Sequence, residues 1–372
     1  MRAVVRRAGK LICDDIDELD PGPGQVRVKT LLCGICGSDL HALHHLDHMV
    51  EMGRRSGGGG GELDPSADIV FGHEFCAEVL EGGPGATRLK PGTRVVSMPV
   101  NMSPTRFDAV GYSNLYPGGF AERMILTEML LLEVPNGLST EHAALTEPMA
   151  VGEHAVASAA LDNTSVALVI GCGPVGLAVI AALKVRGHGP IIAADFSPRR
   201  RAAAEAMGAD VIIDPAQEGP HSKWADFGVP MTGEAMRAAL FSGAQSGRPV
   251  VFECVGAPGV LQSVIEGCPL KAQIIVAGVC METDRIEPSL AINKQLDLRF
   301  VLGYAPDEFA QSLHNIAEGK INVAPMITST VGLDGVAQAF ADLGNPEGNV
   351  KILVNPSLWT PHLGDERRGG RP

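Results

Sequence analysis

The stretch that decides the fold is Val166-Ala-Leu-Val-Ile-Gly171-Cys-Gly173-Pro174-Val175-Gly176. Its apolar run predicts a strand, and the small-residue stretch after the glycines predicts a helix. The spacing between them is Gly-x-Gly-x-x-Gly. In this pattern the first glycine makes the turn, the second admits a pyrophosphate, and the third lets the helix approach the strand. Because a phosphate is bound well at a helix N-terminus, the stretch predicts a dinucleotide-binding unit.

An acidic residue follows at the expected distance. The apolar run Ile191–Ala194 ends at Asp195, about 20 residues beyond Gly176, where a carboxylate binds the ribose hydroxyls. A carboxylate repels a 2′-phosphate, which favours NAD over NADP. Arg199 and Arg200 follow closely and leave NADP open, because they either neutralise a 2′-phosphate or flank the adenosine. A glycine turn without any ligand is the alternative, and the combination of strand, helix and acid argues against it.

From Ser165 onward, strands and helices are expected to alternate along the chain. The alternation predicts an α/β fold with a doubly wound parallel sheet. The expected segments are Val166–Ile170, Val175–Val185, Ile191–Ala194, Pro198–Met207, Val211–Ile213, Val250–Glu253 and Gln273–Gly278.

The N-terminal part has a different pattern, with short β-like runs separated by Gly/Pro clusters. It predicts a second, β-rich domain. The chain of 372 residues is therefore expected to have two domains: 1–150 completed by 295–372, and a nucleotide domain at 151–294. The expected strands of the β-rich part are Arg2–Val5, Val26–Leu32, Phe75–Leu80, Arg94–Met98 and Ala121–Leu126.

Composition and charge argue against several classes of binding partner and cellular location. The net charge of −13 argues against nucleic acid. One apolar run without a charge, Val166–Leu183, is interrupted by glycines, so no membrane segment is expected. Neither a signal peptide nor a disulfide framework is expected, because the N-terminus is charged and the eight cysteines are scattered. A cytoplasmic protein is the default expectation.

A second cluster of residues has metal-ligand chemistry. Cys36-Gly-Ser38-Asp39-Leu-His41 and Gly72-His73-Glu74 bring cysteine, histidine and carboxylate, and Glu147 adds a carboxylate just before the nucleotide domain. These residue types suit a catalytic zinc, which needs three protein ligands and one open position. Each of the residues also has a plain structural interpretation, such as a core cysteine or a hydrogen-bonded histidine.

Taken together, these motifs resemble the zinc-containing medium-chain alcohol dehydrogenases. The resemblance covers about residues 1–355, and Glu147-Pro148 is typical of the sorbitol, threonine and butanediol dehydrogenase branch. It implies a GroES-like catalytic domain beside a Rossmann domain, and a homo-oligomer, with a tetramer favoured over a dimer. The matching segments, in family order, are Gly34–His41, Gly72–Glu74, Pro117–Glu122, Glu147-Pro148 and Gly171–Gly176 with Asp195.

The resemblance also implies residue roles, and through them the reversible NAD-linked oxidation of a small-molecule alcohol or polyol to a ketone or aldehyde. Cys36, His73 and Glu147 would bind Zn²⁺, with Glu74 behind the metal and able to replace a ligand. Ser38 would contact the substrate oxygen and pass its proton towards His41. The implied cofactor residues are Gly171, Gly173, Pro174, Val175 behind the nicotinamide, Gly176, Asp195, Arg200 near the adenosine and Lys351 near the pyrophosphate.

The sequence departs from the family pattern in two places. The segment Val95–Tyr116 has no cysteine, so one catalytic zinc and no structural zinc are expected. The segment between Cys36 and His73 is long and contains His44, His45, His48 and a glycine run. A solvated flap is the preferred interpretation of that segment, and a second metal site is the alternative.

Two other functions remain open at this point. One is a zinc-free quinone or enoyl reductase of the same fold, which would lack the metal residues. The other is a non-catalytic nucleotide-binding protein, which would have lost Ser38 and His41. The sequence does not identify the particular alcohol.

Overall fold

The computed structural model describes residues 1–57, 63–103, 106–135, 137–243, 245–345 and 347–358. Within these residues the chain divides into two compact units. The first comprises Met1–Ala144, Ser329–Gly344 and the chain from Lys351 onward; the second comprises Leu145–Thr328 and Asn345–Val350. Most of the glycine run and Pro361–Pro372 lie outside the described residues.

The first unit is built on a sheet of antiparallel pairs with the order β10-β6-β5-β3-β18-β17, and β9 pairs with β3. The period-2 pattern of a strand with one buried face is clear in β3, where Val28 and Thr30 are buried and Lys29 between them is exposed. The strands are β3 (Gln25–Gly34), β5 (Glu74–Gly82), β6 (Arg94–Ser97), β9 (Arg123–Thr127), β10 (Leu131–Glu133), β17 (Ile327–Val331) and β18 (Lys351–Val354).

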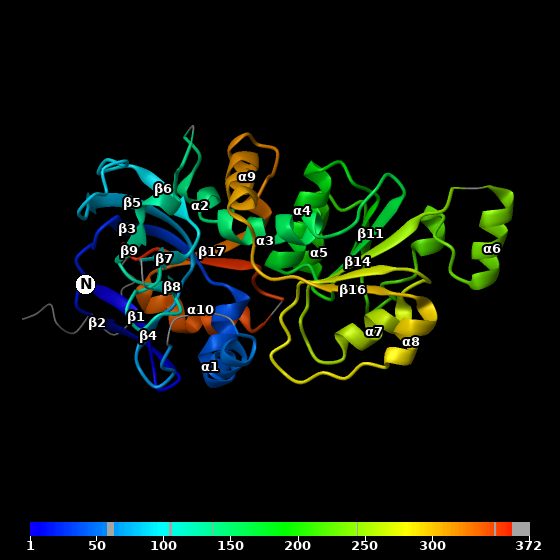
Figure 1. The fold of residues 1–372 in the computed structure, drawn as a ribbon, viewed down its shortest axis with the longest axis horizontal. Coiled ribbons are helices and arrows are strands. Elements are labelled where there is room, and N and C mark those ends of the chain that lie inside the picture. The colour runs from blue at the N-terminus through cyan, green and yellow to red at the C-terminus, as the bar shows by residue number, and fades with distance from the viewer. Residues whose placement is uncertain (58–62, 104–105, 136, 244, 346, 359–372) are drawn as a thin grey trace, which may run out of the picture. The chain divides into compact units, whose positions relative to one another are not determined.

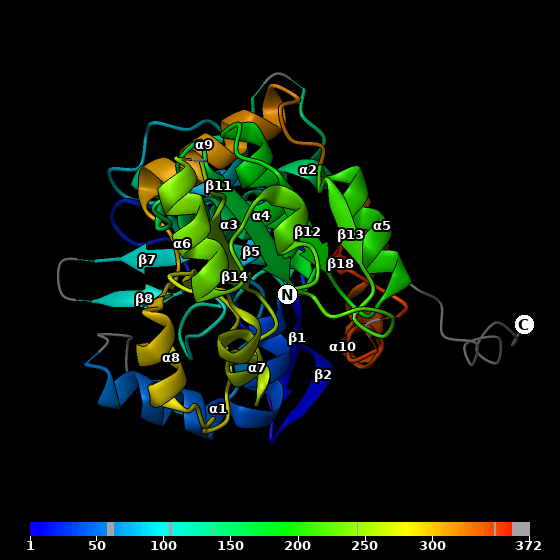
Figure 2. The ribbon, with the colours of Figure 1, turned by 90° about the vertical axis from the view of Figure 1, so that its right-hand side faces the viewer.

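Smaller elements complete the first unit. An antiparallel group has the order β2-β1-β4, and β7 and β8 lie side by side as a separate pair (Figure 2). Phe120 meets the ring of Phe340 on α10 edge-on, with ring centroids 6.0 Å apart. The remaining elements are β1 (Arg2–Arg7), β2 (Lys10–Asp15), β4 (Ile69–Val70), β7 (Val100–Met102), β8 (Phe107–Ala109), α1 (Gly37–Arg55), α2 (Thr140–Ala143) and α10 (Val336–Leu343).

The second unit holds a parallel sheet with the order β13-β12-β11-β14-β15-β16. Its helices lie on both sides, with α4 and α5 on one side and α7 and α8 on the other (Figure 1). Since this is the doubly wound arrangement, the predicted fold class is confirmed. The strands are β11 (Ser165–Ile170), β12 (Ile191–Ala194), β13 (Val211–Ile213), β14 (Arg248–Glu253), β15 (Gln273–Val276) and β16 (Asp297–Phe300). The helices are α3 (Thr146–Ala157), α4 (Pro174–Val185), α5 (Pro198–Ala206), α6 (Gly233–Ser242), α7 (Val260–Gly267), α8 (Pro288–Lys294) and α9 (Pro306–Ala317).

The second unit extends further along the chain than the expected limit of residue 294. β16 continues the parallel sheet beside β15, and His154 of α3 and Glu308 of α9 are 2.9 Å apart. The chain therefore returns to the first unit at Ser329 rather than near residue 295.

The histidine-rich segment is helical rather than a flap. Helix α1 runs through His44 and His48 with a kink at His45, whose backbone angles are not helical. The segment from Ser38 to Met52 contains neither Gly nor Pro, and the carboxylate of Asp39 accepts the Cys36 N–H at the helix start. These features favour a helix over a loop.

No described helix combines the length and the apolar character that crossing a bilayer requires.

Candidate metal and nucleotide sites

The candidate metal site lies where β3, α1 and β5 meet in the first unit. Cys36 is the residue before α1, and His73 and Glu74 stand at the start of β5, where Glu74 is opposite Gly34 of β3. A Cβ atom at Gly34 would lie 2.1 Å from the Glu74 carboxylate, so only glycine fits there. The backbone at the starts of α1 and β5 therefore directs the side chains of Cys36, His73 and Glu74 towards the same position.

Cys36, His73 and Glu74 offer ligand atoms that all lie within 4.8 Å of one another. His73 and Glu74 are buried, and Cys36 is partly buried. Thiolate, imidazole and carboxylate are the ligands that zinc takes in proteins.

Asp39 lies behind the His73 ring. Its carboxylate is fully buried, and Oδ1 lies 3.3 Å from His73 Nδ1, though outside hydrogen-bond alignment. The other nitrogen, Nε2, lies 3.5 Å from Ser38 Oγ and is left for a metal. A carboxylate behind a histidine ligand sets its tautomer and raises its basicity.

The site favours positive charge. Burial acts to lower the pKa of His73, but the charges of Asp39 and Cys36 outweigh it and raise the pKa well above its ordinary value. An environment that stabilises a buried imidazolium also stabilises a cation in its place. The residues present therefore fit a bound metal ion.

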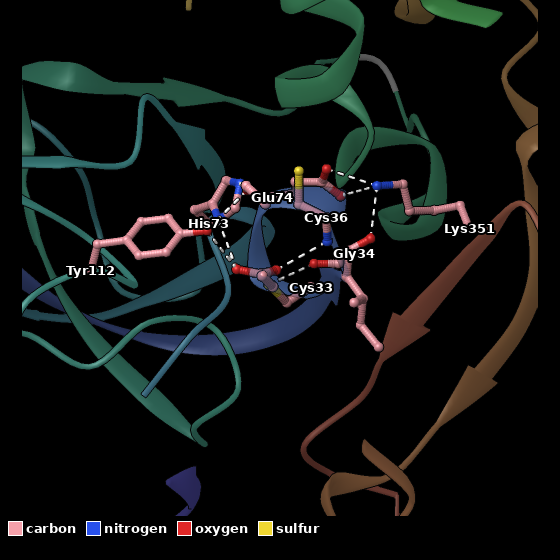
Figure 3. Close-up of polar contacts among 10 residues, drawn as sticks. Cys33, Gly34, Cys36, His73, Glu74, Tyr112 and Lys351 are labelled. Atoms are coloured by element: carbon pink, nitrogen blue, oxygen red, sulfur yellow. Dashed lines mark hydrogen bonds and ion pairs between the residues drawn. The ribbon is translucent and has the colours of Figure 1, made fainter. Parts of the chain in front are cut away.

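Lys351 approaches this cluster from the side opposite Tyr112 (Figure 3). Its Nζ lies 2.7 and 2.6 Å from the two Glu74 oxygens and 2.9 Å from the Ile35 carbonyl oxygen. Both side chains are buried, with exposures of 0% for Lys351 and 1% for Glu74. The structure thus gives Lys351 neighbours inside the first unit, and its predicted approach to a pyrophosphate remains untested.

Tyr112 completes the cluster, and no sequence pattern identified it. Its hydroxyl lies 2.9 Å from Ser38 Oγ and 3.1 Å from Asp39 Oδ1, and its ring centroid is 5.4 Å from that of His73. Burial raises the pKa of Tyr112 well above its usual value, so the hydroxyl keeps its proton at neutral pH.

The other predicted site residues of the first unit lie close in sequence on α1. His41 is one turn beyond Ser38 and partly buried. Burial, followed by the charge of His45, lowers the pKa of His41, so its imidazole is neutral near pH 7. Glu147 belongs to the second unit, where it is buried in the first turn of α3, and its role as third ligand remains a prediction.

The glycine loop of the second unit has the expected geometry. Gly171 has a φ of +89°, and a Cβ at Gly176 would lie 1.8 Å from the Gly171 carbonyl oxygen, so helix and strand approach as the motif requires. Gly173 is the N-cap of α4, and Pro174 and Val175 begin the helix. This helix N-terminus is suited to a pyrophosphate.

Asp195 supports the glycine loop from the end of β12. Its carboxylate accepts the N–H of Cys172 at 2.7 Å and the N–H of Ser197 at 2.8 Å. The guanidinium of Arg200 lies 4.0 Å away. The acid and the arginine therefore stand together beside the loop, and their contacts with a cofactor remain predictions.

Two family models match the chain: "Alcohol dehydrogenase GroES-like domain" over residues 22–136 and "Zinc-binding dehydrogenase" over 174–318. (R,R)-Butanediol dehydrogenase of Bacillus subtilis is 32% identical, covering 92% of this chain and 96% of its own. Sorbitol dehydrogenase of Gallus gallus is 27% identical, covering 95% and 96%.

Solved structures agree with the sequence comparisons. The crystal structure of 2R,3R-butanediol dehydrogenase from Bacillus subtilis superposes with a TM-score of 0.75 at 30% identity, covering 95% of this chain and 99% of that one. A Sinorhizobium meliloti protein solved with NADP gives a TM-score of 0.76 at 25% identity, covering 95% and 99%.

The chain belongs to the zinc-containing medium-chain alcohol dehydrogenases. Within that family it stands with the butanediol and sorbitol dehydrogenases, as the sequence motifs predicted. It is an oxidoreductase that acts on CH–OH groups with zinc and a nicotinamide cofactor. The zinc-free reductase and the non-catalytic protein are set aside by this assignment.

Proposed function

We propose that this dehydrogenase oxidises a polyol or diol with NAD at one zinc ion bound by Cys36, His73 and Glu147. The observation that carries the proposal is the buried cluster of Cys36, His73 and Glu74, in an environment that favours positive charge. The names of the butanediol and sorbitol relatives support substrates with more than one hydroxyl group.

The side chains of the site have distinct proposed roles in the reaction. Bound zinc would supply Lewis acidity that lowers the pKa of the alcohol hydroxyl. We propose that Ser38 accepts the hydroxyl proton as its own hydroxyl proton turns away from Tyr112 and passes to the neutral imidazole of His41, which releases a proton to solvent. The glycine loop and the N-terminus of α4 hold the cofactor pyrophosphate, and Val175 supports the nicotinamide.

Glu74 is proposed to stay with Lys351 rather than serve as a permanent ligand. Its two oxygens accept hydrogen bonds from Nζ at 2.7 and 2.6 Å, which holds the carboxylate beside the metal position. Exchange of Glu74 onto the metal would require breaking this pair.

One zinc per subunit is proposed because the cysteines of a structural site are missing. The segment Val95–Tyr116 has none, and its described residues include the β7–β8 pair and the turn that carries Tyr112.

The described cysteines are all unpaired, which supports a reducing compartment such as the cytoplasm.

A homo-oligomer, with a tetramer favoured over a dimer, is proposed as the assembly. β16 is the last strand of the parallel sheet; Phe300 at its end is 69% exposed, and Leu302 just beyond it is 87% exposed. An uncovered sheet edge with apolar side chains is suited to pairing with a second copy of the chain. Light scattering that gives a mass of 38.9 kDa would contradict the oligomer.

A panel of alcohols and polyols tests the activity, with NADH formation as the readout. Ser38→Ala is expected to lower kcat/KM by about 10²–10⁴-fold, because the hydroxyl proton loses its first acceptor. Ser56→Ala, at the other end of α1, is the control and is expected to leave kcat/KM unchanged. Full activity in Ser38→Ala would remove Ser38 from the reaction.

Cofactor choice is tested at Asp195. Asp195→Asn keeps an oxygen acceptor for one of the two N–H groups, of Cys172 and Ser197, and removes the charge that repels a 2′-phosphate. We expect the ratio of kcat/KM with NAD to that with NADP to fall about tenfold or more. The measurement is steady-state kinetics with both cofactors. A wild-type preference for NADP would contradict the proposal and assign Arg200 to the 2′-phosphate.

A further inference from the structure

The side chain of Tyr112 has no assigned role in the reaction, yet it touches the residue that does the first proton transfer. It lies in the cysteine-free segment Val95–Tyr116, and its hydroxyl is 2.9 Å from Ser38 Oγ. Ser38 Oγ is in turn 3.5 Å from His73 Nε2, the nitrogen left for the metal. Tyr112 Oη therefore stands one hydrogen bond beyond the point where the reacting hydroxyl binds.

The hydrogen bonds that Tyr112 Oη already makes determine which further hydrogen bond it can form. A phenol has one proton and two acceptor positions, whereas a carboxylate only accepts. Asp39 already accepts the Cys36 N–H at 3.0 Å, and Tyr112 Oη lies 3.1 Å from its other oxygen. Hydrogen bonds to a charged acceptor are the stronger ones, so Tyr112 donates to Asp39. Its oxygen then accepts from Ser38 and has one acceptor position left.

The spacing of the two hydroxyls matches a particular substrate shape. Ser38 Oγ and Tyr112 Oη are 2.9 Å apart. Neighbouring oxygens of a 1,2-diol in its gauche form are also about 3 Å apart, the separation of a hydrogen-bonded pair. A substrate that places its reacting hydroxyl on Ser38 thus brings the adjacent hydroxyl to Tyr112. A lone alcohol has no second hydroxyl to place there, and a 1,3-diol reaches this separation only in its folded form and not in its extended one.

We propose that Tyr112 is a specificity-determining residue, which accepts the second hydroxyl of a vicinal diol beside the one that Ser38 accepts. This inference rests on the proposed function, since it takes Ser38 to be the group that meets the reacting hydroxyl. The ring of Tyr112 is held by Phe71 and His73, with centroids 5.9 and 5.4 Å away, so the hydroxyl is positioned before substrate binds.

The test compares three four-carbon substrates: 2,3-butanediol, 1,3-butanediol and 2-butanol. In the wild-type enzyme kcat/KM is expected to be highest for 2,3-butanediol. Tyr112→Phe removes only the hydroxyl, and the lost hydrogen bond is expected to lower kcat/KM for 2,3-butanediol about tenfold. Most of this loss falls in KM, because the second hydroxyl is bound equally before and during reaction. The values for 2-butanol and 1,3-butanediol are expected to change by less than about twofold.

The matched control is Tyr116→Phe. Tyr116 lies in the same segment, but its hydroxyl bonds Gln25 at 3.1 Å, so no change of substrate preference is expected. A general disturbance by Tyr112→Phe would lower kcat for all three substrates together and would overturn the proposal. An equal wild-type preference for diol and monoalcohol would do so as well.

Ser38→Ala separates this inference from the proposed function. If Ser38→Ala loses activity on every substrate while Tyr112→Phe keeps the diol preference, the inference fails and the function stands. If Ser38→Ala oxidises 2,3-butanediol as well as the wild-type enzyme does, the role of Ser38 fails and the inference fails with it.

Discussion

Replacing His73 with alanine is expected to remove zinc and to lower kcat/KM for alcohol oxidation by about 10³-fold or more. The estimate follows from the several kcal/mol that a metal contributes to charge stabilisation at the reacting oxygen. His73 is buried, Asp39 lies 3.3 Å behind its Nδ1, and alanine offers no atom that could bind the metal in place of Nε2. Metal content and steady-state kinetics on one preparation give both readouts.

His44→Ala is the matched control. His44 lies on the exposed part of the same helix, α1, in the segment for which a second metal site was the alternative interpretation. We expect it to keep both zinc and activity. If His44→Ala loses the metal while His73→Ala retains it, the zinc site lies in the histidine-rich segment and not at His73.

The second large effect is expected at Lys351. Lys351→Met should lower the free energy of unfolding by about 3–5 kcal/mol, because it leaves the Glu74 carboxylate buried without its cation. Both side chains are at most 1% exposed, so water cannot replace the lost ammonium group. Denaturant unfolding of the metal-free protein measures this loss without a contribution from bound zinc.

A double-mutant cycle with Glu74→Gln identifies the cause of the loss of stability in Lys351→Met. If the charge pair is responsible, the two changes together cost less than the sum of the single changes. Additive losses would show that Lys351 stabilises the fold through its packing and not through Glu74.

The second unit could be predicted from sequence in detail. Segments such as Val166–Ile170 and Val211–Ile213 are strands over the expected residues, because buried parallel strands are short apolar runs bounded by turns. β16 was missed, since Asp297–Phe300 carries two charged residues and exposed side chains at the sheet edge and has no apolar run. The expected domain limit at residue 294 was therefore too early.

Only those residues of the candidate site that belong to short sequence motifs could be predicted from the sequence. Cys36, His73 and Glu74 follow from short motifs, and the structure brings them within 4.8 Å. The partners of these residues come from distant parts of the chain. Lys351 is 277 positions from Glu74, and Tyr112 is 74 positions from Ser38. Neither pairing has a pattern in the sequence, because tertiary packing alone determines it.

The most direct test of the central claim is zinc per subunit, measured by plasma mass spectrometry on the wild type and on Cys36→Ser, with NADH formation followed in parallel. We predict about one zinc in the wild type, lost in Cys36→Ser together with activity, as a three-ligand catalytic site requires. About two zinc ions would reveal a site beyond this cluster. No zinc in an active wild-type enzyme would contradict the account.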